Sequence, residues 1–286
     1  MRIMARAMLA AGLACGCGSV IAADSAPPAQ KSSGGENLAE KATNPTAFLM
    51  QMRFQDAYTP TTRNASSYSN AALFQGVIPT KLGWGSAAQV MINRITMPYV
   101  TTPQIDGVND GDRATGMGDS LLNTWFISSW LPKGQVLAWG TTVTVPTAGD
   151  NEETGAGQWQ AGPTMAYVNT NTPSWQWGGM WYQQWDVSST RSDAADVSAL
   201  SVQPIITKHF KGGWYISAPD APNSYNFKTN KWTLALGAVV GKVTTWGAQP
   251  IQLFAEAYYN PVKHNRAPSP EWTFKVNISF LLPESN

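Results

Sequence analysis

Apolar and polar positions alternate along most of the chain after Pro45. The segment "EWTFKVNISFLL", residues 271–282, shows the pattern most clearly. Its apolar positions are Trp272, Phe274, Val276, Ile278, Phe280 and Leu282. Most of the intervening positions are polar, and successive side chains of a strand point to opposite faces, so the segment predicts a strand with one apolar and one polar face. The apolar face could meet either a protein core or the hydrocarbon of a membrane.

The same pattern, broken by turn residues, predicts about twelve strands. They are 47–58, 67–78, 85–99, 118–131, 135–145, 158–169, 174–187, 198–209, 213–218, 230–243, 249–260 and 271–282. Lengths near ten residues suit tilted membrane strands, and single-chain bacterial barrels have an even number of strands. Alternation is ambiguous in 85–99 and 118–131, and Pro219 interrupts the strand that begins at 213, so ten or fourteen strands stay open.

The connections between these segments alternate between long and short across the whole series. "TTPQIDGVNDGDRATGMG" is long, the next connection "LPKGQ" is tight, and "PTAGDNEETGAG" is long again. Outer-membrane barrels have long loops outside the cell and tight turns at the periplasmic side. A soluble sandwich has no physical reason for such alternation, because both of its ends meet the same water. The pattern therefore predicts an all-β, antiparallel up-and-down barrel in the outer membrane of a Gram-negative bacterium, with both termini in the periplasm.

The first residues predict export. Arg2 and Arg6 precede an apolar run, and "VIAAD" offers a small-residue cleavage site, which is typical of a secretory signal peptide. The run is too short to span a bilayer as an anchor, and a lipoprotein through Cys15 or Cys17 is the other alternative. We expect a signal peptide at 1–22, a periplasmic linker at 23–45 and a barrel at 46–286. "ENLAEKAT", residues 36–43, predicts a short helix or a further piece of linker.

Composition narrows the class further. Charged residues make up only 13% of the chain, there are 13 tryptophans, and the mean hydropathy is −0.22. Low charge with mild hydropathy is typical of a barrel, because half of each strand faces water. Both cysteines leave with the signal peptide, which excludes a disulfide framework and thiol chemistry. Loss of Arg2 and Arg6 lowers the basic count from 19 to 17 against 18 acids, so no basic excess attracts nucleic acid.

Several ordered segments resemble one known family. They are "NLAEKATNPTAFLMQMRFQDAYTP", "FQGVIPTKLGWG", "NRITMPYVTTP", "GMGDSLLNTWFISSWLP", "VPTAGDNEETGAGQWQAGPTMAY" and "YYNPVKHNRAPSPEWTFKVNISFLLP". The chain resembles a family of outer-membrane transporters assigned to the meta-cleavage pathway of phenol degradation. The resemblance implies a barrel and the transport of small aromatic compounds. One departure is the terminus: many such barrels end on an aromatic residue read by the barrel-assembly machinery, whereas Phe280 is followed by "LLPESN".

No catalytic or metal-binding motif appears in the sequence. His209 and His264 are the only histidines, and neither lies in a metal-ligand spacing. The acidic, glycine-rich loops "GVNDGDRATGMGD" and "GDNEETG" do not have the spacing of an EF-hand, so flexible loops are favoured over calcium sites. A Ser-His-acid site on the barrel wall stays open, since such triads are recognised by geometry. We therefore expect no enzyme activity, no cofactor and no metal.

Strand parity assigns a set of polar residues to the inside of the barrel. Arg53 lies on the first strand, Glu256 on the eleventh and Lys275 on the twelfth, and closure brings these strands together. The predicted pore-lining residues are Arg53, Gln203, Thr207, Gln252, Glu256, Tyr258, Lys275 and Asn277. In a wet lumen their charges would act on solutes, whereas in a narrow barrel they would form a structural ion-pair network.

Taken together, the patterns predict a passive outer-membrane channel for small, aromatic or hydrophobic solutes. Its expected partners are outer-membrane lipid, the small-molecule solute and, during biogenesis, the barrel-assembly machinery. Two alternatives remain: a lipid-acting outer-membrane enzyme, for which His209 is the only histidine in the predicted wall, and a structural barrel with a closed lumen. A folded-in loop or the N-terminal helix could plug a barrel of this size.

Overall fold

The computed structural model describes residues 38–104, 113–149, 153–190, 192, 194, 196–263 and 268–283. All of them belong to one compact unit. The predicted signal peptide, most of the predicted linker, and His264 lie outside the described residues, so those predictions stay predictions. Within the described residues, no helix combines the length and the apolar character needed to cross a membrane.

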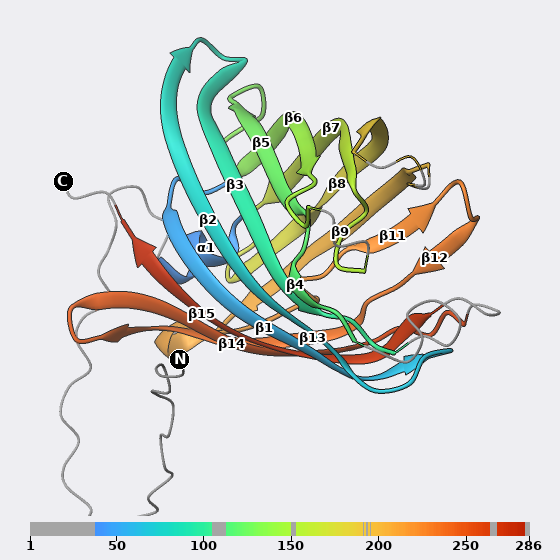
Figure 1. The fold of residues 1–286 in the computed structure, drawn as a ribbon. Coiled ribbons are helices and arrows are strands. Elements are labelled where there is room, and N and C mark those ends of the chain that lie inside the picture. Colours follow the sequence, from blue (N-terminus) through green and yellow to red (C-terminus); the bar gives the residue numbers. More distant parts are fainter. Residues whose placement is uncertain are drawn as a thin grey trace, which may run out of the picture. The chain divides into compact units, whose positions relative to one another are not determined.

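One short helix precedes a large antiparallel sheet (Figure 1). The helix is α1 (Leu38–Thr43). The strands are β1 (Met50–Arg63), β2 (Ser69–Trp84), β3 (Ala88–Thr101), β4 (Thr115–Met117), β5 (Ser120–Ser128), β6 (Gln135–Val145), β7 (Gln158–Asn169), β8 (Trp175–Ser189), β9 (Ser198–His209), β10 (Trp214–Ser217), β11 (Asn223–Asn226), β12 (Lys231–Thr233), β13 (Leu236–Trp246), β14 (Gln249–Tyr259) and β15 (Ser269–Leu282). A 3-10 turn, η1 (Lys211–Gly213), joins β9 to β10.

The sheet closes on itself. β1 pairs with both β2 and β15, and β10 pairs with β9 on one side and β13 on the other. Over the described residues the result is a closed barrel of 12 wall strands, which confirms the predicted fold and strand number. Closure leaves no free sheet edge in hydrocarbon, where unpaired backbone groups would be costly.

Two of the twelve wall strands consist of two pieces. β10 and β11 share one neighbour, β9, and residues 218–222 between them leave the wall. Pro219 and Pro222 explain the break, because a proline has no N–H with which to pair in a central strand. The second divided strand consists of β12 and β13, which Leu234 and Ala235 separate.

Predicted and observed strands agree closely. β6, β7 and β9 have the predicted bounds, and most of the others differ by one to three residues at an end, but β1 and β2 continue five and six residues beyond their predicted ends at 58 and 78. Two strands were not predicted: β4, which extends the β3 edge, and β11, which lies in a segment predicted as loop. The predicted helix also forms over Leu38–Thr43, while its predicted first two residues, 36 and 37, lie outside the described residues.

The outer face of the barrel is apolar and carries aromatic residues near both ends. We call the end with the tight turns the short-turn end and the opposite one the long-loop end. Exposed aromatic residues near the short-turn end are Trp84, Trp130, Trp139, Trp175, Trp214 and Trp246. Those near the long-loop end are Tyr58, Tyr68, Tyr99, Trp159, Trp185 and Trp272. Exposed aliphatic side chains such as Ile95, Val240 and Val276 lie between them, an arrangement typical of a lipid-facing wall.

Candidate functional site in the barrel lumen

The inner face of the barrel combines apolar and polar side chains. Buried apolar side chains on β2 to β9 form one cluster, which includes Val77, Ile92, Trp125, Met180 and Ile205. The same strands also carry buried polar side chains, such as Gln75, Asn123 and Gln176. The strands β13 to β1 present mainly buried polar side chains. These include Gln51, Gln55, Gln252, Glu256, Lys275 and Asn277. The lumen is therefore amphipathic across its width, unlike the uniformly apolar interior of a soluble domain.

The helix α1 lies inside the ring of strands near the short-turn end (Figure 1). On one side Ala42 packs with Leu49 and Leu281. On the other side the Thr43 hydroxyl lies 2.9 Å from Gln176 Oε1 on β8 and 2.9 Å from His209 Nε2 on β9. The helix is therefore fixed to opposite walls and occupies this end of the lumen.

His209 is the residue on which the lipid-enzyme alternative depended. Its side chain is 6% exposed and contacts Thr43 of the helix, so it points into the lumen rather than toward lipid. Among the described residues no three His, Cys, Asp or Glu side chains gather as a metal site. In the acidic loop near residue 119, both Asp119 oxygens accept hydrogen bonds from loop N–H groups, those of Ala148 and Ala156.

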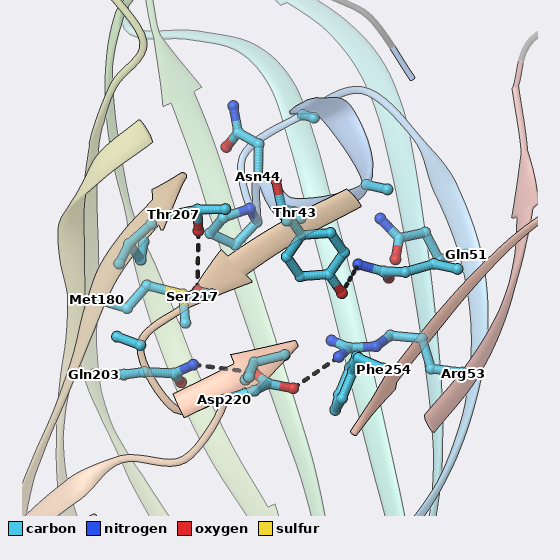
Figure 2. A pocket seen from close by; sticks show the side chains of 18 of the residues that line it. Thr43, Asn44, Gln51, Arg53, Met180, Gln203, Thr207, Ser217, Asp220 and Phe254 are labelled. Atoms are coloured by element: carbon cyan, nitrogen blue, oxygen red, sulfur yellow. Dashed lines mark hydrogen bonds and ion pairs between the residues drawn. The ribbon is translucent and has the colours of Figure 1, made fainter. Parts of the chain in front are cut away.

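Residues 218–222 form a second insertion into the lumen, and Asp220 holds it there. The Asp220 Oδ2 atom accepts hydrogen bonds from Arg53 Nη2 at 2.7 Å and Gln55 Nε2 at 3.2 Å. The Oδ1 atom accepts one from Gln203 Nε2 at 3.0 Å (Figure 2). Lys275 Nζ donates to the Asp220 backbone oxygen. Four donors from β1, β9 and β15 thus converge on one residue, which fixes the segment across the barrel.

A buried ion pair adjoins this segment. Lys275 Nζ lies 3.0 Å from Glu256 Oε2, and the two side chains are 5% and 0% exposed. Their strands are directly paired, with Glu256 opposite Lys275. Two buried charges of this kind are tolerated only as a pair, since either alone would be strongly destabilising.

Arg94 on β3 is the remaining charge of the group. Its guanidinium lies over the Trp125 ring, 4.7 Å from the centroid, and Nη2 donates to Asn123 Oδ1 at 3.1 Å. We call Arg53, Arg94, Asp220, Glu256 and Lys275 the Asp220 cluster, because Asp220 bonds Arg53 and Lys275, Lys275 pairs with Glu256, and Arg94 lines the same cavity as Asp220. Three cations against two carboxylates leave the cluster with one positive charge in excess.

Between α1 and the inserted segment lies a cavity of about 100 Å³ (Figure 2). Its apolar lining includes Val77, Trp125, Met180, Ile205 and Phe254. Its polar lining includes Thr43, Gln51, Arg53, Arg94, Gln203, Thr207, Asp220 and Gln252. An engineered apolar cavity of roughly 150 Å³ holds a benzene molecule, so this one is smaller than an aromatic ring needs and suits a shorter aliphatic group.

The eight predicted pore-lining residues fall into two groups. Four of them line the cavity: Arg53, Gln203, Thr207 and Gln252. Glu256, Lys275 and Asn277 are buried residues of the polar side, and Asn277 Nδ2 bonds Ser279 Oγ at 2.9 Å. Tyr258 is half-buried beside Thr273 of β15 and does not line the cavity. Whether solute passes along any of them stays a prediction.

Comparison with solved structures gives the same architecture. The chain is similar to the COG4313 outer membrane channel from Pseudomonas putida F1, with a TM-score of 0.60 at 14% identity over 82% of this chain and 94% of that one. It is more weakly similar to outer membrane phospholipase A from Escherichia coli, with a TM-score of 0.42, 11% identity, and 82% and 96% coverage. The Salmonella typhi outer membrane phospholipase dimer with bound calcium gives a TM-score of 0.43 at 12% identity, over 85% of this chain and 95% of that one.

These similarities show the fold alone. At these identities no residue role transfers, and the two phospholipase matches carry no argument about catalysis. No family model and no curated protein matches the sequence. The resemblance to outer-membrane transporters is thus supported at the level of the barrel, while the phenol pathway stays a prediction.

Sequence reasoning missed Asp220 and Arg94. Asp220 lies in "APDAP", which predicts a turn or an outer loop, and nothing local indicates that the segment turns inward. Arg94 lies on the strand where alternation was ambiguous, because Ile92 and Ile95, on opposite faces, are both apolar. A lone arginine within a membrane strand is itself a signal, since a charge there must face the lumen.

Proposed function

We propose that the chain is an outer-membrane channel that admits small apolar or aromatic solutes passively. The observation that carries the proposal is the amphipathic cavity inside a closed barrel whose outer face is apolar. A solute with an aromatic ring would contact Trp125, Met180 and Phe254, while its polar group would meet the glutamines and arginines of the same lining. Contacts of this kind are weak and numerous, which permits both entry and release.

Placement in the outer membrane follows from the wall. Two aromatic belts with aliphatic residues between them fit the two interfaces and the hydrocarbon of a bilayer. In that placement the short-turn end faces the periplasm, and α1 lies at the periplasmic mouth. The similarity to an outer membrane channel supports the same placement.

Passage requires movement, because two insertions narrow the lumen. The contacts of Thr43 hold α1, and the contacts of Asp220 hold residues 218–222. Each set consists of only a few hydrogen bonds, and thermal motion on a microsecond-to-millisecond scale can break and remake so few bonds. The same two insertions favour the second candidate, a structural barrel with a closed lumen.

Planar-bilayer conductance and liposome swelling with the purified, exported form of the chain separate the two candidates. The channel predicts discrete current steps, and swelling in glycerol that is faster than in protein-free liposomes and faster than in a large sugar. A barrel that inserts in the bilayer yet gives no current and no swelling with any solute would refute the channel and leave the structural barrel.

A further inference from the structure

We propose that Arg94 is the anion-binding residue of a solute site in this cavity, and that the site takes small monocarboxylates with an apolar body. The inference rests on the proposed channel function and names its solute class. It depends on three features: the pairing of all the other charges in the Asp220 cluster, the unused N–H donors of Arg94, and the apolar side chains around the Arg94 guanidinium.

The other charges of the Asp220 cluster are paired. Arg53 bonds Asp220 at 2.7 Å, and Lys275 lies 3.0 Å from Glu256. Asp220 already accepts three side-chain hydrogen bonds, so both of its oxygens are engaged. Within the described part of the chain, no carboxylate lies within 4.0 Å of Arg94. The excess positive charge of the cluster therefore resides on Arg94.

Arg94 is held in place with donors to spare. Asn123 Oδ1 is the one acceptor that the described residues give it, at 3.1 Å. Asn123 is itself fixed, because its Nδ2 donates to Thr142 Oγ1 at 2.9 Å. The Arg94 Nε–H is buried and has no acceptor. A buried donor without a partner is costly, and a bound carboxylate would satisfy it.

The surroundings of Arg94 select the ligand class. A planar guanidinium matches a carboxylate through two parallel hydrogen bonds. Trp125, which supports the guanidinium from below, is fixed by its own bond from Nε1 to Thr164 Oγ1 at 3.1 Å. Val77, Met180 and Ile205 supply apolar surface for the rest of the ligand. One excess charge and about 100 Å³ of space favour a small monoanion over a phosphate dianion.

Binding can be measured without transport. The folded barrel in detergent is titrated with butyrate, which is small enough for the cavity, and saturation-transfer NMR reports the ligand bound; 1-butanol is the neutral counterpart. We expect butyrate to bind more tightly than 1-butanol. We expect Arg94→Gln to weaken butyrate binding about 10-fold or more while binding of 1-butanol is unchanged. Arg94→Lys keeps the charge but lacks the planar fork, so its butyrate affinity should be intermediate.

Lys242→Gln is the matched control. Lys242 also lies over a tryptophan, 5.1 Å from the Trp214 ring centroid, but it is on the same face of β13 as exposed Val240. Its replacement should leave butyrate binding unchanged. Circular dichroism and heat-modifiable gel mobility establish that each variant is folded before it is titrated.

Two outcomes overturn the inference: butyrate binding no tighter than 1-butanol binding in the wild type, or folded Arg94→Gln binding butyrate as the wild type does. Failure of the channel function gives a different result. In that case butyrate binds and depends on Arg94, but the barrel does not raise butyrate uptake by liposomes above that of protein-free liposomes.

Discussion

Replacing Asp220 with asparagine removes the charge that holds residues 218–222 in the lumen. The carboxylate accepts hydrogen bonds from Arg53, Gln55 and Gln203, and its ion pair with Arg53 is 2.7 Å long. Asparagine has nearly the same shape but retains one neutral oxygen, which can still accept a bond from Gln203. Arg53 keeps its bond to Gln75 Oε1 at 2.8 Å, so the barrel wall itself is little affected.

The expected size follows from the lost bonds. A hydrogen bond to a charged group contributes about 1.5–3 kcal/mol. Asp220→Asn loses two such bonds, to Arg53 and Gln55. At about 1.5 kcal/mol each, the free-energy difference that favours the inserted conformation falls by at least about 3 kcal/mol. Since 1.4 kcal/mol is a factor of ten, the displaced conformation should become about 100-fold more populated. The Asp220 cluster also changes from one excess positive charge to two.

Single-channel recording in planar bilayers measures both effects. Asp220→Asn should show larger or more frequent open events than the wild type, and its reversal potential in a KCl gradient should shift toward anion selectivity. Asp186→Asn is the control. The Asp186 carboxylate accepts a hydrogen bond from the Val197 N–H at 2.7 Å, and it does not belong to the Asp220 cluster. If folded Asp220→Asn has the open probability and reversal potential of the wild type, the inserted segment does not control the lumen.

Three further predictions concern the helix α1, the buried ion pair and the outer face of the barrel. Thr43→Val removes the bonds to Gln176 and His209, so it should weaken the attachment of α1 to the lumen wall by about 1–2 kcal/mol and raise the conductance in planar bilayers. Unchanged conductance would mean that α1 is not the barrier to flow. Glu256→Gln should lower the free energy of unfolding in urea by about 3–5 kcal/mol, because Lys275 loses its charged partner. Adding Lys275→Met should restore most of that loss, and a double variant as unstable as the single one would argue against a coupled pair. Val276→Lys, on the outer face and 57% exposed, should destabilise the barrel in vesicles by about 2–4 kcal/mol if it lies at the bilayer midplane, whereas Thr229→Lys in an exposed loop should have little effect.

The sequence predicted the wall well because the wall obeys local rules. Period-two alternation and turn residues are enough to locate β6, β7 and β9 to the residue. The parity that separates Val276 from Lys275 also assigned the buried ion pair to the inside. Both results depend on neighbours along one strand or across one hairpin, which the order of residues determines directly.

The sequence left open a plug made by the N-terminal helix or by a folded-in loop, but the contacts that hold α1 and residues 218–222 escaped prediction because they join distant parts of the chain. Asp220 meets Arg53 across 167 positions of sequence, and Thr43 meets His209 across 166. No local pattern specifies such contacts; only the closure of the barrel, which brings β1 beside β15 and places β9 opposite, creates them.

The difficulty with β3 has a chemical origin that bears on function. Alternation is a good guide where one face meets lipid and the other meets water, but it fails where both faces are apolar. On β3 the outward Ile95 and the inward Ile92 are both apolar, because this side of the lumen is lined by the cluster around Trp125. A pore for sugars or ions has no use for such a lining, whereas apolar solutes require one. The strand that is hardest to predict from sequence therefore marks the side of the lumen where an apolar solute would bind.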